Sequence, residues 1–106
     1  MWLFTSSGFV SIVQDRDNKD NLMVRARVRD HLKALFPAAA IIETVDADYR
    51  YRATVVRNVV QQAMADQVNA IDYPNFKDTV TDAPYHSACL QVWSSMHQLQ
   101  MQTLKE

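Results

Sequence analysis

Arginine residues alternate with apolar residues in two separate stretches of this chain, residues 24–29 and 49–53. Successive side chains of an extended chain point to opposite faces, so each stretch predicts a β-strand with one buried face and one arginine-bearing face. Guanidinium groups bind phosphates and carboxylates through paired hydrogen bonds and stack on nucleic-acid bases. The pattern therefore predicts a candidate binding surface on the open side of a sheet. Its members are Arg25, Arg27, Arg29, Arg50 and Arg52.

A solvated sheet face, balanced by acidic side chains, is the alternative that the sequence favours for these arginines. The net charge of −1 supplies no surplus positive field to attract a nucleic acid. If the turn between their strands has four residues, Glu43 faces Arg52, in an exposed ion pair worth only about 0–1 kcal/mol. Tyr49 and Tyr51 alternate with the arginines, so we expect both rings to point the other way, toward the core or its rim.

The segment 72–78 is a second candidate binding site, because it follows neither the helical nor the strand period and combines acid, amide, aromatic and amine side chains. Loops of such composition often carry function. The alternative, which the residue types favour, is chain reversal: Pro74 and Asn75 are turn formers, and Asn75 can cap the turn that follows. The candidate binding residues of this loop are Asp72, Tyr73, Asn75 and Lys77.

Catalytic and metal-binding chemistry finds little support in the sequence. His86 and Cys89 have the spacing of neighbours on a helix, as a thiolate–imidazole pair would need. Cys89, however, lies on an apolar stripe, where a small buried residue is expected. The aspartates of residues 15–20 do not fit a calcium loop, since Lys19 and Ala26 would occupy ligand positions. We predict no catalytic residue, no metal ligand and no cofactor; a small enzyme using His86 and Cys89 is the less favoured alternative.

The elements that position these residues follow from periodicity and turn signals. Strands are predicted at residues 9–14 (beginning as early as residue 2), 22–28, 40–45 and 49–56. Helices are predicted after Asp30, over about 58–71 and after Asp82, where the two aspartates would serve as N-caps. The order ββαββαα predicts an α+β fold with an antiparallel four-stranded sheet and helices packed on one face.

Burial expectations follow from the same patterns. In the strands we expect the apolar side chains to face the helices, namely Val24, Ala26, Val28, Ala53 and Val55. In the last helix one stripe holds Tyr85, Cys89, Val92, Met96 and Leu99, widened by Leu90 and Trp93. We therefore expect this helix to be a core element, with Val92, Trp93 and Met96 buried and Cys89 inaccessible.

Several blocks of the chain resemble a family of small uncharacterised bacterial proteins. The blocks are MWLFT with Gly8-Phe9, VRARVR at 24–29, ADYRYRA at 47–53, IDYPNFKD at 71–78, and Tyr85 with Val92-Trp93. The resemblance covers nearly the whole chain up to Gln100. It implies a compact bacterial domain and transfers no catalytic residue.

Size and composition define the broad class. The chain has 106 residues, of which 48% are hydrophobic and 22% charged, which predicts one folded domain over residues 1–106. Its single cysteine, together with the lack of a signal-peptide pattern or a membrane-length apolar run, predicts a cytoplasmic protein. We predict a small binding or adaptor domain that recognises a protein or a polyanion through the arginines or the 72–78 loop. Nucleic acid is a less favoured partner, self-association is a further one, and no membrane partner is expected.

Overall fold

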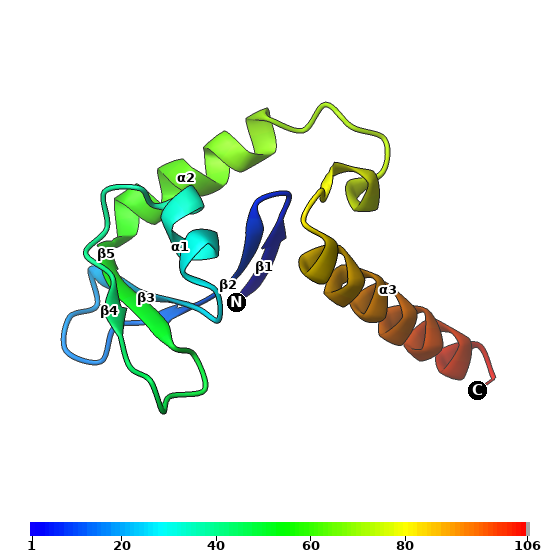
Figure 1. The fold of residues 1–106 in the computed structure, drawn as a ribbon, viewed down its shortest axis with the longest axis horizontal. Coiled ribbons are helices and arrows are strands. Elements are labelled where there is room, and N and C mark those ends of the chain that lie inside the picture. Colours follow the sequence, from blue (N-terminus) through cyan, green and yellow to red (C-terminus); the bar gives the residue numbers. More distant parts are fainter. Residues whose placement is uncertain (106) are drawn as a thin grey trace. The chain divides into compact units, whose positions relative to one another are not determined.

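The computed structural model describes residues 1–105, which form two compact units, Met1–Asp72 and the segment from Tyr73 onward. The elements of the first unit are β1 (Trp2–Thr5), β2 (Gly8–Gln14), β3 (Asn21–Ala26), α1 (Arg29–Leu35), β4 (Ile42–Glu43), β5 (Tyr51–Val56) and α2 (Arg57–Asn69) (Figure 1). The second unit contains a short 3-10 helix, η1 (Phe76–Thr79), and α3 (Ala83–Leu104). The mixed α+β class is confirmed.

The strands form one antiparallel sheet in the order β1-β2-β3-β5-β4. The sheet has five strands where four were expected, because residues 2–14 form a hairpin rather than one strand. The Thr5 hydroxyl fixes this hairpin: its Oγ1 accepts from the backbone N–H groups of Ser7 and Gly8 (3.2 Å each) and donates to the Gly8 carbonyl (2.9 Å). The element order is therefore βββαββαα.

Gly8 lets α1 approach the hairpin closely. It has a φ of 156°, and a Cβ atom placed there would lie within 2.5 Å of His31 Cβ and Cδ2, well inside van der Waals contact. His31 also accepts a hydrogen bond on Nδ1 from the backbone N–H of Phe9, at 3.2 Å. Helix α1 therefore contacts the start of β2 at Gly8, where a larger side chain would collide with His31.

The strand expected at 40–45 is reduced to the two residues of β4, and β5 begins at Tyr51 rather than Tyr49. The residues between them form a turn closed by hydrogen bonds from Thr44 N to the Arg50 carbonyl (2.7 Å) and from Ala47 N to the Thr44 carbonyl (3.2 Å). The register pairs Glu43 with Tyr51 instead of Arg52. The expected Glu43–Arg52 pair is therefore wrong.

Both helices of the first unit pack on one face of the sheet: α1 contacts β2, β3 and β5, and α2 contacts β3 and β5. The core between them consists of Val10, Ile12, Val24, Ala26, Leu32, Phe36, Ala53, Val55 and Val60. Val24, Ala26, Ala53 and Val55 are buried as expected. Val28 is 46% exposed, because β3 has ended and Val28 occupies the N-cap position that Asp30 was expected to hold.

In the second unit two predicted caps are confirmed. Asn75 Oδ1 accepts from the backbone N–H of Lys77 at 3.2 Å, and Asp82 Oδ2 accepts from that of Tyr85 at 3.1 Å. The inaccessible position of Cys89 is also confirmed, since it is 6% exposed.

The core assignment of the remaining part of α3 is wrong. Val92, Trp93 and Met96 are 38%, 54% and 58% exposed. The other element described in this unit, η1, is a single turn, which is too short to cover a helix of 22 residues, and only Tyr85 and Cys89 of α3 are buried. No helix within the described residues is long and apolar enough to cross a membrane.

Candidate functional site on the open face of the sheet

The sheet register places the arginines of β3 and β5 beside each other. Ser11 of β2 pairs with Arg25 of β3, which pairs with Arg52 of β5. Their sequence neighbours Val24 and Ala53 belong to the core under the helices. Since side chains alternate along a strand, Ser11, Arg25 and Arg52 lie on the opposite, open face, as the sequence predicted for the two arginines.

Tyr49 stands at the centre of this group. The Cζ atoms of Arg25 and Arg27 lie 4.6 and 4.3 Å from the centroid of its ring, the distance of a cation–π contact. The ring is 5% exposed but is not part of the core under the helices. The expectation that it points away from the arginines is wrong, because Tyr49 lies in the turn before β5 and does not follow the strand alternation. Tyr51, inside β5, packs against the core as expected.

Hydrogen bonds hold the three guanidinium groups in place. Arg25 Nη2 donates to Ser11 Oγ (2.8 Å), and Arg27 Nη1 donates to the Asp48 carbonyl oxygen (2.7 Å). Arg52 donates from Nε to the Tyr49 carbonyl oxygen (3.3 Å) and from Nη2 to Asp48 Oδ1 (3.2 Å). We call Arg25, Arg27 and Arg52, gathered around Tyr49, the arginine cluster. It holds three positive charges against the one carboxylate of Asp48.

Two of the five predicted arginines lie outside the cluster. Arg50 forms an ion pair with Glu43, at 2.7 Å between Nη2 and Oε2. The hydrogen bond and charge of Glu43 raise the pKa of Arg50 above its ordinary value. Arg29 is the first residue of α1 and is exposed, so its placement on a strand is wrong: β3 ends at Ala26. The placement of Arg27 and Arg50 on strands is wrong for the same kind of reason, because Arg27 follows β3 and Arg50 precedes β5.

Three aromatic side chains share the open face with the cluster. Trp2 pairs with Ser11 and Phe4 with Phe9 in the register of the β1–β2 hairpin. The Phe9 ring stacks on Phe4 at 4.5 Å and meets the Trp2 ring edge-on at 6.2 Å, while Trp2 itself is 71% exposed. These aromatic side chains were not among the predicted binding residues. Trp2 and Phe4 are two residues apart and share one face of β1, as Phe9 and Ser11 share one face of β2, but which faces meet depends on the register of the hairpin.

The candidate residues of the 72–78 loop stabilise a turn through contacts within the second unit. The Tyr73 ring lies 6.3 Å from that of Phe76, Asn75 caps η1, and Lys77 Nζ lies 5.0 Å from the centroid of the Trp93 ring. Asp72, the last residue of the first unit, is exposed. These contacts account for Tyr73, Asn75 and Lys77 without a ligand.

Other candidate chemistry is sparse. Cys89 is buried and His86 half-buried. Within residues 1–105 no three side chains of His, Cys, Asp or Glu gather as metal ligands would. Asp15 accepts from the backbone N–H of Asn18 at 3.1 Å, as in an ordinary turn.

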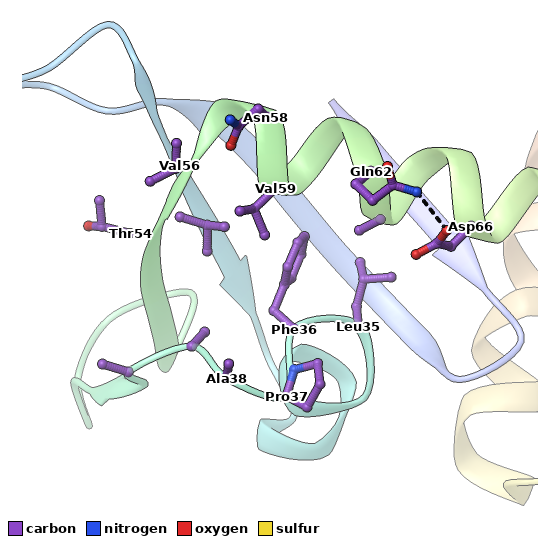
Figure 2. A pocket seen from close by; sticks show the side chains of 14 residues that line it. Leu35, Phe36, Pro37, Ala38, Thr54, Val56, Asn58, Val59, Gln62 and Asp66 are labelled. Atoms are coloured by element: carbon purple, nitrogen blue, oxygen red, sulfur yellow. Dashed lines mark hydrogen bonds between the residues drawn. The ribbon is translucent and has the colours of Figure 1, made fainter.

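The helix side of the first unit contains a pocket of about 560 Å³. Figure 2 shows it between β5, α2 and the segment that follows α1, with mainly apolar side chains around it. Its one charged lining residue, Asp66, accepts a hydrogen bond from Gln62 Nε2 at 2.9 Å. The pocket was not foreseen from the sequence, and it lacks a group of convergent polar side chains that would define a ligand.

Comparisons with protein-family models, with curated proteins and with solved structures give no match to this chain. The resemblance to small bacterial proteins stays a prediction.

Proposed function

We propose that this protein is a binding domain that holds a polyanion on the open face of its sheet, through the arginine cluster. The observation that carries the proposal is the gathering of three guanidinium groups at Tyr49: those of Arg25 and Arg27 lie over its buried ring, and that of Arg52 donates to its carbonyl oxygen. Within the described residues, the one ion pair of this group is that between Arg52 and Asp48. Arginines grouped in this way repel one another, and an anionic ligand relieves that repulsion.

The cluster is preorganised for such a ligand. The Tyr49 ring and the acceptors on Ser11 and Asp48 fix the guanidinium groups before anything binds. Each guanidinium group has five N–H donors, of which these contacts use one or two, so several donors remain for phosphate or carboxylate oxygens. Ordering the side chains in advance reduces the entropy that binding must overcome.

Among polyanions, single-stranded nucleic acid is the ligand that the exposed Trp2 ring favours. Trp2 lies on the same cross-strand row as Ser11 and Arg25, and Phe9 contacts its edge. A base stacked on an aromatic side chain contributes about 1–3 kcal/mol, while arginines bind the backbone phosphates. An acidic protein segment would use the arginines but would leave Trp2 without a stacking partner.

The test measures binding of two labelled probes, a single-stranded oligonucleotide and a polyglutamate peptide, over a salt series. Replacing Arg27 and Arg52 with alanine should weaken binding of either probe at least tenfold. For each phosphate that the variant no longer neutralises, the salt slope for the oligonucleotide should fall by about 0.7. Arg50→Ala is the matched control, because Glu43 already neutralises that arginine; it should change the affinity less than twofold. Circular dichroism verifies the fold of each variant.

Trp2→Ala separates the two ligand classes. It should weaken oligonucleotide binding and leave polyglutamate binding unchanged. If neither probe binds the wild-type protein at low salt, the proposed function is wrong and the arginines form a solvated face.

A further inference from the structure

Strand β5 has one edge that is paired over only part of its length. Its neighbour β4 pairs with Tyr51 and Arg52, and no strand among residues 1–105 pairs on this side with the other four residues of β5. Before β4 the chain leaves the sheet: residues 37–39 form a turn, in which Ala39 N donates to the Phe36 carbonyl oxygen at 3.1 Å. The edge of β5 beyond Arg52 therefore has no neighbouring strand in the described part of the chain.

The register shows which backbone groups this edge offers. In an antiparallel sheet, the backbone groups of successive residues point to opposite edges of the strand. Arg57 N donates to the Asp20 carbonyl oxygen at 2.8 Å, so residue 57 faces β3. Steps of two residues place Val55 on the β3 side and Thr54 and Val56 on the other side. Within the described residues, no backbone hydrogen bond reaches the N–H and C=O groups of Thr54 or the N–H group of Val56.

The apolar pocket of about 560 Å³ lies along this edge. Residues 54–56 form one wall, residues 35–40 form a second, and α2 forms a third through Val59 and its neighbours. Figure 2 shows Thr54 and Asp66 at opposite ends of the pocket. Because α2 and residues 35–40 stand on two sides, a single extended chain fits here, whereas the edge of a second folded sheet would collide with these walls.

We infer that this edge binds an extended segment of a partner protein, which adds to the sheet as a strand antiparallel to β5, where a longer β4 would lie. A partly paired strand edge is a template for another extended chain, and backbone hydrogen bonds supply the affinity of such complexes. Four of the six residues of β5 follow Arg52, so the added strand is short, about 13 Å at 3.3 Å per residue. The inference does not depend on the arginine cluster, which lies on the open face of the sheet.

The pocket specifies the side chains of this segment. Alternate side chains of a strand share one face, so those on the helix side of the sheet enter the pocket. There Phe36, Val55 and Val59 favour apolar side chains. Asp66 is the one charged residue of the lining, so a basic side chain at the end of the segment is favoured over an acidic one. The partner segment therefore alternates apolar and other residues and carries a lysine or arginine.

Fluorescence anisotropy with labelled six-residue peptides and the full chain tests the inference. In three probes, valine, leucine or phenylalanine alternates with threonine, and a lysine ends the sequence; at least one should bind. In the antiparallel arrangement the threonine N–H groups face β5 and the N–H groups of the apolar residues face away. Methylation of the threonine amides should therefore weaken binding at least tenfold. Methylation of the other amides is the matched control and should weaken it less than threefold.

Protein variants locate the bound peptide. Val59 and Val68 are both exposed residues of α2, but only Val59 lines the pocket. Val59→Gln should weaken binding at least fivefold, whereas Val68→Gln, the matched control, should change it less than twofold. Asp66→Asn should weaken binding of the lysine-ended probe and leave an alanine-ended probe unaffected. Circular dichroism verifies the fold of each variant.

The outcomes distinguish strand addition from other contacts. Failure of all three probes to bind the wild-type chain at millimolar concentration overturns the inference. Equal losses on methylation of either set of amides would show apolar contact without an added strand, and would also overturn it. The Arg27→Ala, Arg52→Ala double variant should bind the probes like the wild type; loss of binding there would assign the contact to the arginine cluster. A dimer that Val59→Gln dissociates would assign the pocket to a second copy instead.

Discussion

Helices α1 and α3 both have apolar residues at helical spacing, but they bury them very differently. Leu32 of α1 is 0% exposed and packs in the core against the sheet, whereas Val92 of α3 is 38% exposed. Helix α1 contacts three strands of the sheet, β2, β3 and β5, while in the second unit α3 contacts the short turn η1. Periodicity therefore predicts that a helix forms and which side is apolar, but burial also requires a partner surface.

The largest difference is expected between truncation of a leucine in α1 and truncation of a leucine in α3. Leu32 of α1 is fully buried, so Leu32→Ala should lower the free energy of unfolding by about 2–5 kcal/mol. Leu99→Ala in α3 should cost less than about 1 kcal/mol when measured at a concentration where the chain is monomeric. Urea denaturation of the two variants measures both values. Equal reductions would show that α3 is covered in the monomer.

Gly8→Ala tests how closely α1 approaches the β1–β2 hairpin. The added methyl group would overlap the His31 side chain, so we expect a decrease of about 3 kcal/mol in unfolding free energy. The second substitution His31→Ala should recover part of that decrease in a double-mutant cycle. Strict additivity of the two changes would contradict the close approach.

Trp93→Ala should have a small effect, and its size distinguishes an exposed tryptophan from an enclosed one. A fully enclosed tryptophan would cost about 3–5 kcal/mol on truncation. Because the ring is 54% exposed, and its described ring contacts are to Lys77 and His97, we expect about 1 kcal/mol in the monomer. Thermal unfolding at low protein concentration measures the change. A destabilisation in the range of a buried tryptophan would contradict the exposure of α3.

Local chemistry explains which features were predictable from the sequence. Strand alternation identifies the core residues Val24 and Ala53 and the open-face arginines, because both strands have regular register. The Asp82 cap was predictable because it needs only a side chain and the next backbone turn.

The features that were missed depend on where elements end and how strands align. Tyr49 meets the arginines because β5 begins two residues later than expected, and Arg29 belongs to a helix because β3 ends early. Trp2 joins the open face only through the register of a hairpin that Thr5 and Gly8 create. None of these follows from the period of a single segment.

The composition of α3 predicts how this helix responds to salt. Dissolved salt screens interactions between exposed charges, and none of the 22 residues Ala83–Leu104 is Asp, Glu, Lys or Arg. The helicity of α3 should therefore change little between low and high sodium chloride, whereas the exposed ion pair between Arg50 and Glu43 in the first unit should weaken.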